Sequence, residues 1–123
     1  MATLPITYTL ECRPEDDGPE GHFASGSDAD DAETLRWIRE QLDSGNDWAW
    51  CCVRVVATVD FDGEAFQGNT FLGGCSYLSE DDFKEGCYYA DLCEEAREDL
   101  LRTLDHAVKV GDLVASARKQ VAP

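Results

Sequence analysis

The residues of this chain best suited to chemistry are its carboxylates. There are 26 Asp and Glu against 10 Lys and Arg, which gives a formal net charge of −16. General acid–base catalysis needs two carboxylates in different environments, usually with one of them partly buried so that its pKa rises. The acids here occur in polar stretches and on the polar sides of expected helices, so no pair stands out. We therefore expect neither an acid–base active site nor an enzyme.

Six cysteines and two histidines are the other possible metal ligands and nucleophiles. None of them forms the close pairs, such as two cysteines separated by two residues, that structural zinc sites use. Cys51 and Cys52 are adjacent, so on a strand they point to opposite faces. A reactive thiol needs a basic neighbour or a helix N-terminus that lowers its pKa, and this acidic chain offers few. We expect buried, reduced thiols, no metal and no cofactor.

Two groups of acids are dense enough to suggest a surface that binds a partner. In the N-terminal third we single out Asp16, Asp17, Asp30 and Asp31. The second group lies on the polar side of the last expected helix and comprises Asp91, Glu94, Glu95, Glu98 and Asp99. Helical side chains three or four positions apart are about 5–6 Å from one another, which resembles the spacing of phosphates along a nucleic-acid strand. Such a ridge fits a groove that binds DNA or RNA; the alternative is an ordinary solvated helix face.

Trp48 and Trp50 form a third candidate site. On a strand they share the face opposite the main apolar stripe, because side chains alternate between the two faces. If helices cover only one side of the sheet, the two rings form an exposed patch for a partner. The alternative is that a loop or the N-terminal segment covers them and makes a small separate core.

Alternating apolar and polar residues predict strands at residues 6–13 and 48–61. In the second strand the apolar face consists of Ala49, Cys51, Val53, Val55, Ala57, Val59 and Phe61. Asp62 and Gly63 have the chemistry of a tight turn, and residues 64–72 return as the partner strand. A glycine pair ends that strand, and residues 75–78 continue it or add a fourth strand.

Two main helices are expected. The first begins at Asp30, with Glu33 three positions later as in a capping box, and ends at Gly45. The second runs from Tyr88 to about Lys109, and Gly111 ends it. A short helix after the strands leads into it. The order β-α-β-β-(β)-α predicts a single acidic α+β domain over residues 1–123, with an antiparallel sheet of three or four strands and both main helices on one face.

Composition bounds the class of partner. With 43% hydrophobic residues and twelve aromatic residues, the chain can form a core. A charge of −16 repels nucleic acid and anionic lipid, so we expect no direct nucleic-acid or membrane binding, but it attracts basic protein surfaces. Solubility or adaptation to salt is the alternative reason for this charge. No signal peptide and no run of ~18 apolar residues is evident, which favours a cytoplasmic location.

Several stretches resemble small acidic proteins of phages and prophages, a family to which no activity is assigned. The matching stretches are residues 45–51 (GNDWAWC), 72–77 (LGGCSY), 82–83 (DF) and 88–89 (YY). The resemblance extends over residues 45–101, more than half of the chain, and supplies no functional residue to carry over. It implies a mobile-element setting, in which small acidic proteins are similar in kind to anti-restriction and anti-CRISPR inhibitors that mimic DNA.

The leading hypothesis is therefore an inhibitor, encoded by a phage or other mobile element, that acts in the cytoplasm of the host cell. It binds a defence protein that has a basic nucleic-acid-binding surface, and it does so through its acids. The alternative is a non-enzymatic accessory or assembly protein that binds its partner through an aromatic patch around Trp48 and Trp50.

Overall fold

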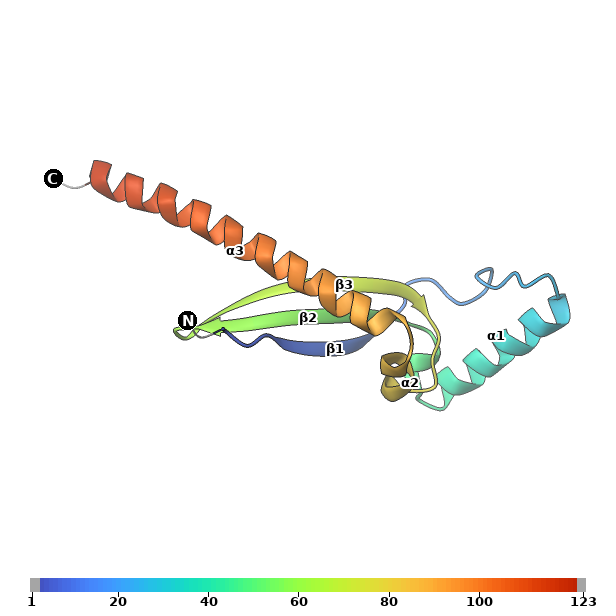
Figure 1. Ribbon diagram of the computed structural model, residues 1–123. Helices are drawn as coiled ribbons and strands as arrows, with labels where there is room; N and C mark the ends of the chain where they lie inside the picture. Colours follow the sequence, from blue (N-terminus) through green and yellow to red (C-terminus); the bar gives the residue numbers. More distant parts are fainter. Residues whose placement is uncertain (1–2, 122–123) are drawn as a thin grey trace.

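A computed structural model describes residues 3–121 of the chain, which form a three-stranded sheet with helices at one end and across one face (Figure 1). In chain order the elements are β1 (Thr7–Pro14), α1 (Asp28–Asp43), the 3-10 helix η1 (Asp47–Ala49), β2 (Cys51–Phe61), β3 (Glu64–Cys75), α2 (Glu80–Glu85) and α3 (Tyr88–Val121). The α+β class is confirmed.

The sheet is antiparallel with the order β1-β2-β3. Asp62 and Gly63, with φ of 52° and 82°, turn β2 into β3 as the sequence predicts. β3 does not end at its glycine pair but continues to Cys75, which pairs with Cys51. The register shifts between Cys51 and Val53, so the glycine pair forms a bulge within β3. Residues 75–78 therefore do not form a fourth strand.

The main core lies between the sheet and α3. Alternate residues of β2 from Cys51 to Val59 are buried there, together with Phe83 of α2 and with Leu92, Ala96 and Leu100 of α3. Phe61 was expected to continue this face but is 59% exposed, because it lies beside the turn at the end of the sheet. α3 packs mainly on β3 and β2, as predicted for the last helix.

α1 packs at the end of the sheet rather than on its face. Its principal contacts are with η1, which follows it after a link of three residues. Together they bury Ile38, Ala49 and Trp50, with Phe23, Trp37 and Leu42 packed around them; we call this cluster the small core. Because α3 crosses the face of the narrow sheet and the link to β2 is short, α1 remains beside the sheet end (Figure 1).

α3 is longer than the sequence predicts, since it passes through Gly111 and continues to Val121. One glycine costs a helix only about 1 kcal/mol relative to alanine, and good helix formers such as Ala115 and Ala117 follow it. The helix crosses the sheet diagonally and extends well past it (Figure 1). Every residue from 108 to 121 is exposed.

Candidate acidic binding surface

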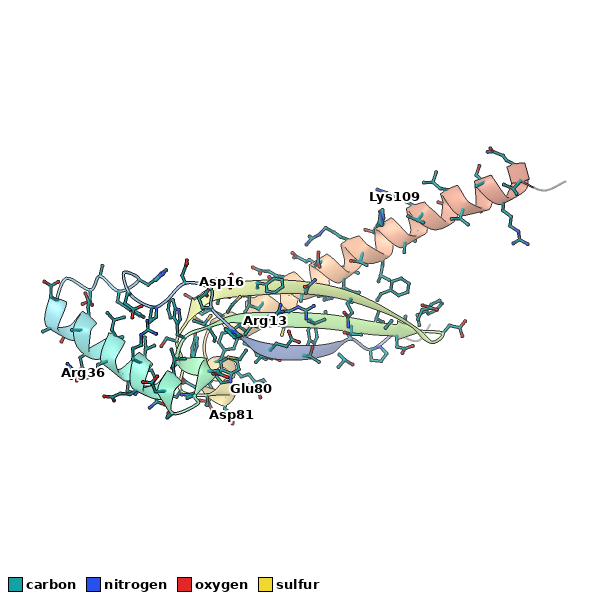
Figure 2. All side chains as sticks on the ribbon, turned by 180° about the vertical axis from the view of Figure 1, so that it is seen from behind. Arg13, Asp16, Arg36, Glu80, Asp81 and Lys109 are labelled. Carbon is teal, nitrogen blue, oxygen red and sulfur yellow. The ribbon has the colours of Figure 1, made fainter. Side chains whose placement is uncertain are left out.

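The acids are concentrated at the end of the molecule that carries α1. Residues 15–47 hold eleven Asp and Glu against Arg36 and Arg39, and residues 80–99 hold nine against Lys84 and Arg97. Figure 2 shows Asp16, Glu80 and Asp81 toward this end, and Lys109 on the part of α3 that leaves the sheet. We call the surface of residues 15–20, α1, α2 and residues 88–99 the acidic end.

The acids at the start of α1 are held by a helix cap. Ser27 is the N-cap, and its Oγ accepts a hydrogen bond from the backbone N–H of Asp30 at 3.3 Å. Asp30 therefore lies inside the first turn and is not the cap that the sequence analysis made it. Asp31 is half-buried and accepts a hydrogen bond from the Ser25 hydroxyl at 2.7 Å, which ties the preceding loop to the helix. Carboxylates in a first turn are favoured by the helix dipole.

The loop of residues 15–20 is fixed at three points. Glu15 accepts a hydrogen bond from the backbone N–H of Gly74 at 2.7 Å. The indole N–H of Trp50 donates to the carbonyl oxygen of Asp17 at 2.7 Å, and Glu20 forms an ion pair with Arg39. These contacts leave the side chains of Asp16 and Asp17 exposed, without an ion pair to any described residue.

α2 contributes acids that the sequence analysis did not select. Ser79 caps this helix by accepting from the backbone N–H of Asp82 at 3.2 Å, and Asp82 accepts from the N–H of Leu78 at 2.9 Å. Between them, Glu80 lies 3.8 Å from Lys84, and Asp81 is exposed with no ion pair to a described residue. The signal available in the sequence was the Ser79 cap, because acids are favoured directly after such a residue.

Two of the five acids chosen on α3 hold that helix to the sheet. Asp99 accepts from the backbone N–H of Asn69 at 2.8 Å and lies 3.4 Å from Arg102; that hydrogen bond, with the cation, lowers the pKa of Asp99. Glu95 accepts from the Thr70 hydroxyl at 2.9 Å. Both carboxylates therefore have a structural role at the edge of β3.

The other three acids face solvent. Glu94 lies 3.4 Å from Arg97, whereas Asp91 and Glu98 make no ion pair with the described residues. Across residues 3–121, only five of the 26 acids are in ion pairs. Most of the negative charge is thus available to a partner.

The two tryptophans do not form the surface that the sequence suggested. Residues 47–49 form η1, so strand alternation begins only at Cys51, and the expectation that Trp48 and Trp50 share one face is wrong. Trp50 is 6% exposed in the small core, where its ring centre lies 5.1 Å from that of His22. Trp48 packs on the main core, 5.7 Å from the ring of Phe83. The alternative of a covered small core holds for Trp50.

The structure also bears on metal binding and on the reactivity of the thiols. Within residues 3–121, no group of three or more His, Cys, Asp or Glu is arranged to hold a metal ion. Burial raises the pKa of the Cys51 thiol and raises that of Cys75 to about 11, so both thiols stay protonated and unreactive.

A shallow hollow of about 300 Å³ lies between the loop and α1, and its lining includes Asp16, Asp17, Asp47 and Arg39. Pro14, Pro19, Leu42 and Trp50 also line this hollow, so its surface is partly apolar.

Comparison of the chain with family models, with curated proteins and with solved structures finds no match. None of the helices in residues 3–121 is both long enough and apolar enough to cross a membrane. The acidic end is therefore the feature of the molecule from which a function can be inferred.

Proposed function

We propose that the protein binds the basic, nucleic-acid-binding surface of another protein through its acidic end and so blocks that surface. The observation that carries this proposal is the segregation of charge. Exposed carboxylates that make no ion pair with a described residue come from the loop after β1 (Asp16), from α2 (Asp81) and from the first turn of α3 (Asp91), which follows α2 directly and packs against it. A protein whose acidity served only solubility would not need its charge concentrated in this way.

The chemistry of recognition is the replacement of phosphates by carboxylates. A groove that binds DNA or RNA is lined by Lys and Arg, which hold phosphate oxygens with charge-assisted hydrogen bonds. Carboxylates accept the same hydrogen bonds, and they do so here from capped helices and a loop fixed at Gly74, Trp50 and Arg39. Within each helix or loop the carboxylates keep their spacing, so little conformational entropy is lost there on binding.

The target class that we propose is a host defence protein of the restriction or CRISPR type, the class that the expected mobile-element setting would supply. Binding should be steered by long-range attraction and should weaken steeply between low and moderate salt.

The test is affinity capture from nuclease-treated host lysate over a salt series, followed by competition. The captured protein should release its DNA or RNA when this protein is added. The variant Asp16→Asn/Asp81→Asn/Asp91→Asn removes three charges from the acidic end and should lose both capture and competition.

A matched control removes three charges from the opposite end of the sheet. Asp60→Asn/Asp62→Asn/Glu64→Gln changes exposed acids at the turn between β2 and β3, which form no ion pair with the described residues. This control should bind as the wild type does. Equal loss in both triple variants would mean that net charge alone matters, and no loss in either would refute the proposal.

A further inference from the structure

The exposed C-terminal part of α3, residues 108–121, has an apolar composition that solvent alone does not explain; we call it the overhang. Its large side chains are strongly exposed, with Val108 at 64%, Leu113 at 71% and Val114 at 60%. A helix of this length is only marginally stable in water by itself, and contiguous exposed apolar surface usually marks an interaction site. The overhang therefore needs a partner surface.

An apolar stripe runs along one side of α3 from the sheet into the overhang. It consists of Leu101, Leu104, Val108, Gly111 and Ala115, spaced alternately by three and four residues as in a coiled coil. Leu104 packs against the main core, and Leu101, at 42% exposure, lies just beyond it. The stripe is thus continuous with the interface between α3 and the sheet.

The position of this stripe follows from the contacts of α3 with β3. Glu95 and Asp99 bond to Thr70 and Asn69, so their side of the helix faces the outer edge of β3. The stripe lies on the opposite side, toward β1. There Ile6, Tyr8 and Leu10 are only half-buried, because α3 packs on β3 and β2.

We infer that the occupant of this surface is a second copy of the chain, with the two α3 helices packed antiparallel and crossing at Val108. In this register Leu101 of one copy faces Ala115 of the other, and Leu104 faces Gly111. Large residues then oppose small ones on both sides of the crossing, where Val108 meets its own copy. A parallel pair would instead place Leu101 against Leu101 and Gly111 against Gly111, leaving voids that cores avoid.

The antiparallel arrangement also brings opposite charges together. The overhang has three cations, Lys109, Arg118 and Lys119, against the single acid Asp112, in a chain of net charge −16. None of the three cations forms an ion pair with a described residue. Crossing at Val108 places Arg118 at the level of Glu98 in the other copy, and Lys119 at the level of Arg97, whose charge is already paired with Glu94.

The same arrangement gives a partner to a second side of the overhang, while Leu113, which lies opposite the stripe, remains exposed. α3 crosses the sheet diagonally (Figure 1), so an antiparallel second helix on its β1 side passes over β1. Val114 and Val121 lie on that helix where they meet the half-buried Tyr8 and Leu10 of the first copy. Each overhang would thereby cover the part of the sheet that the other copy's own α3 leaves open.

The inference can be tested apart from the proposed binding function, because Asp16, Asp81 and Asp91 lie outside the helix crossing; of the acidic end, the dimer covers only the part around Glu98. It is tested by sedimentation and light scattering of the full chain over a concentration series, at about 0.15 M salt so that net repulsion is screened. The wild type should have twice the chain mass of 13.6 kDa. A wild type that stays monomeric into the submillimolar range overturns the inference.

Two substitutions locate the interface. Val108→Glu should raise the dissociation constant at least about tenfold, as expected for a central apolar contact. Leu78→Glu is the matched control, since Leu78 has the same 64% exposure outside the overhang, and it should leave the dimer intact. Equal weakening by both, or by neither, overturns the assignment.

Gly111→Leu tests the dimer interface without disturbing the fold of the single chain. An added Cβ at Gly111 meets nothing within 4 Å in the single chain, and leucine favours a helix more than glycine does. This variant should therefore keep or increase its helical signal while losing the dimer, because the new side chain collides with the opposing Leu104. A stable dimer of Gly111→Leu contradicts the register.

A charge exchange tests the antiparallel direction. Arg118→Glu should weaken the dimer, and adding Glu98→Lys should restore it, because only an antiparallel pair places positions 118 and 98 together. Failure of the double variant to recover would contradict the direction.

Discussion

The approach of α3 to β3 is so close at Gly68 that this position has no room for a side chain. A Cβ there would lie 2.0 Å from the backbone nitrogen of Leu100 and 2.5 Å from the carbonyl oxygen of Ala96. Non-bonded carbon atoms prefer separations of about 3.5–4.0 Å, so Gly68→Ala must push the helix away by more than about 1 Å. No side-chain rotation can relieve the overlap, because the neighbouring atoms belong to the backbone.

The cost of Gly68→Ala follows from what this shift disturbs. Overpacking a core costs about 1–3 kcal/mol. Withdrawal of α3 also weakens the hydrogen bond from the Asn69 N–H to Asp99, now 2.8 Å long, which contributes about 1–2 kcal/mol. Alanine is otherwise better than glycine in a strand by about 0.5–1 kcal/mol. The expected net loss of stability is about 2–4 kcal/mol.

The measurement is urea unfolding followed by circular dichroism, in which this loss lowers the midpoint by roughly 1–2 M. Gly73→Ala is the control in the same strand, since its Cβ would meet the flexible carboxylate of Glu15 at 3.2 Å. The control should change stability by less than about 1 kcal/mol. If Gly68→Ala unfolds at the wild-type midpoint, the packing argument is refuted.

Three further predictions concern single side chains. Ile38→Ala should destabilise α1 by about 2–4 kcal/mol, seen as faster amide exchange there, because it empties the centre of the small core; unchanged exchange would contradict this. Asp99→Asn should lower stability by about 1 kcal/mol near neutral pH. Because the fold lowers the pKa of Asp99, the wild-type advantage exists above the unfolded value of about 3.9 and should vanish as the pH falls through the folded value; a pH-independent difference would refute this origin. Cys87, the exposed thiol, should be alkylated before the buried Cys75, as mass spectrometry of the native protein would show; equal rates would contradict the burial.

The sheet was predictable because its signals are local. Apolar residues at every second position from 51 to 59 mark a strand with one buried face, and Asp62 with Gly63 marks the turn after it. The class of fold follows from the order of such elements. These features need no knowledge of distant contacts.

The wrong predictions concern features that depend on tertiary packing rather than on local sequence. Nothing local in Trp48 or Trp50 reveals that η1 interrupts the alternation, because that depends on α1 being available to cover Trp50. Gly111 has the residue type of a helix end, yet α3 continues through it, because one glycine costs a helix only about 1 kcal/mol and good helix formers such as Ala115 and Ala117 follow. Sequence spacing also placed α1 on the sheet, whereas the short link to β2 keeps it beside the sheet end.

The negative charge of the candidate surface could be predicted from the sequence, but the acidic residues that form it could be predicted only in part. Composition alone indicates an acidic binding surface. Asp99 bonds to β3, whereas Asp91 makes no ion pair with a described residue. This difference can be known only from how close each part of α3 lies to the sheet edge. Asp81 belongs to the candidate surface because α2 lies beside the other acidic elements, which the sequence does not show (Figure 2).

The division of the interior into two clusters has a consequence for motion. α1 packs on the small core, which shares no buried residue with the main core. A unit with few buried contacts opens at a lower free energy than the whole domain. α1 can therefore swing on the link at residues 44–46 while the sheet remains folded, and the distance between its carboxylates and those of α2 and α3 becomes adjustable. A partner groove of fixed width would then select the matching separation from an existing ensemble.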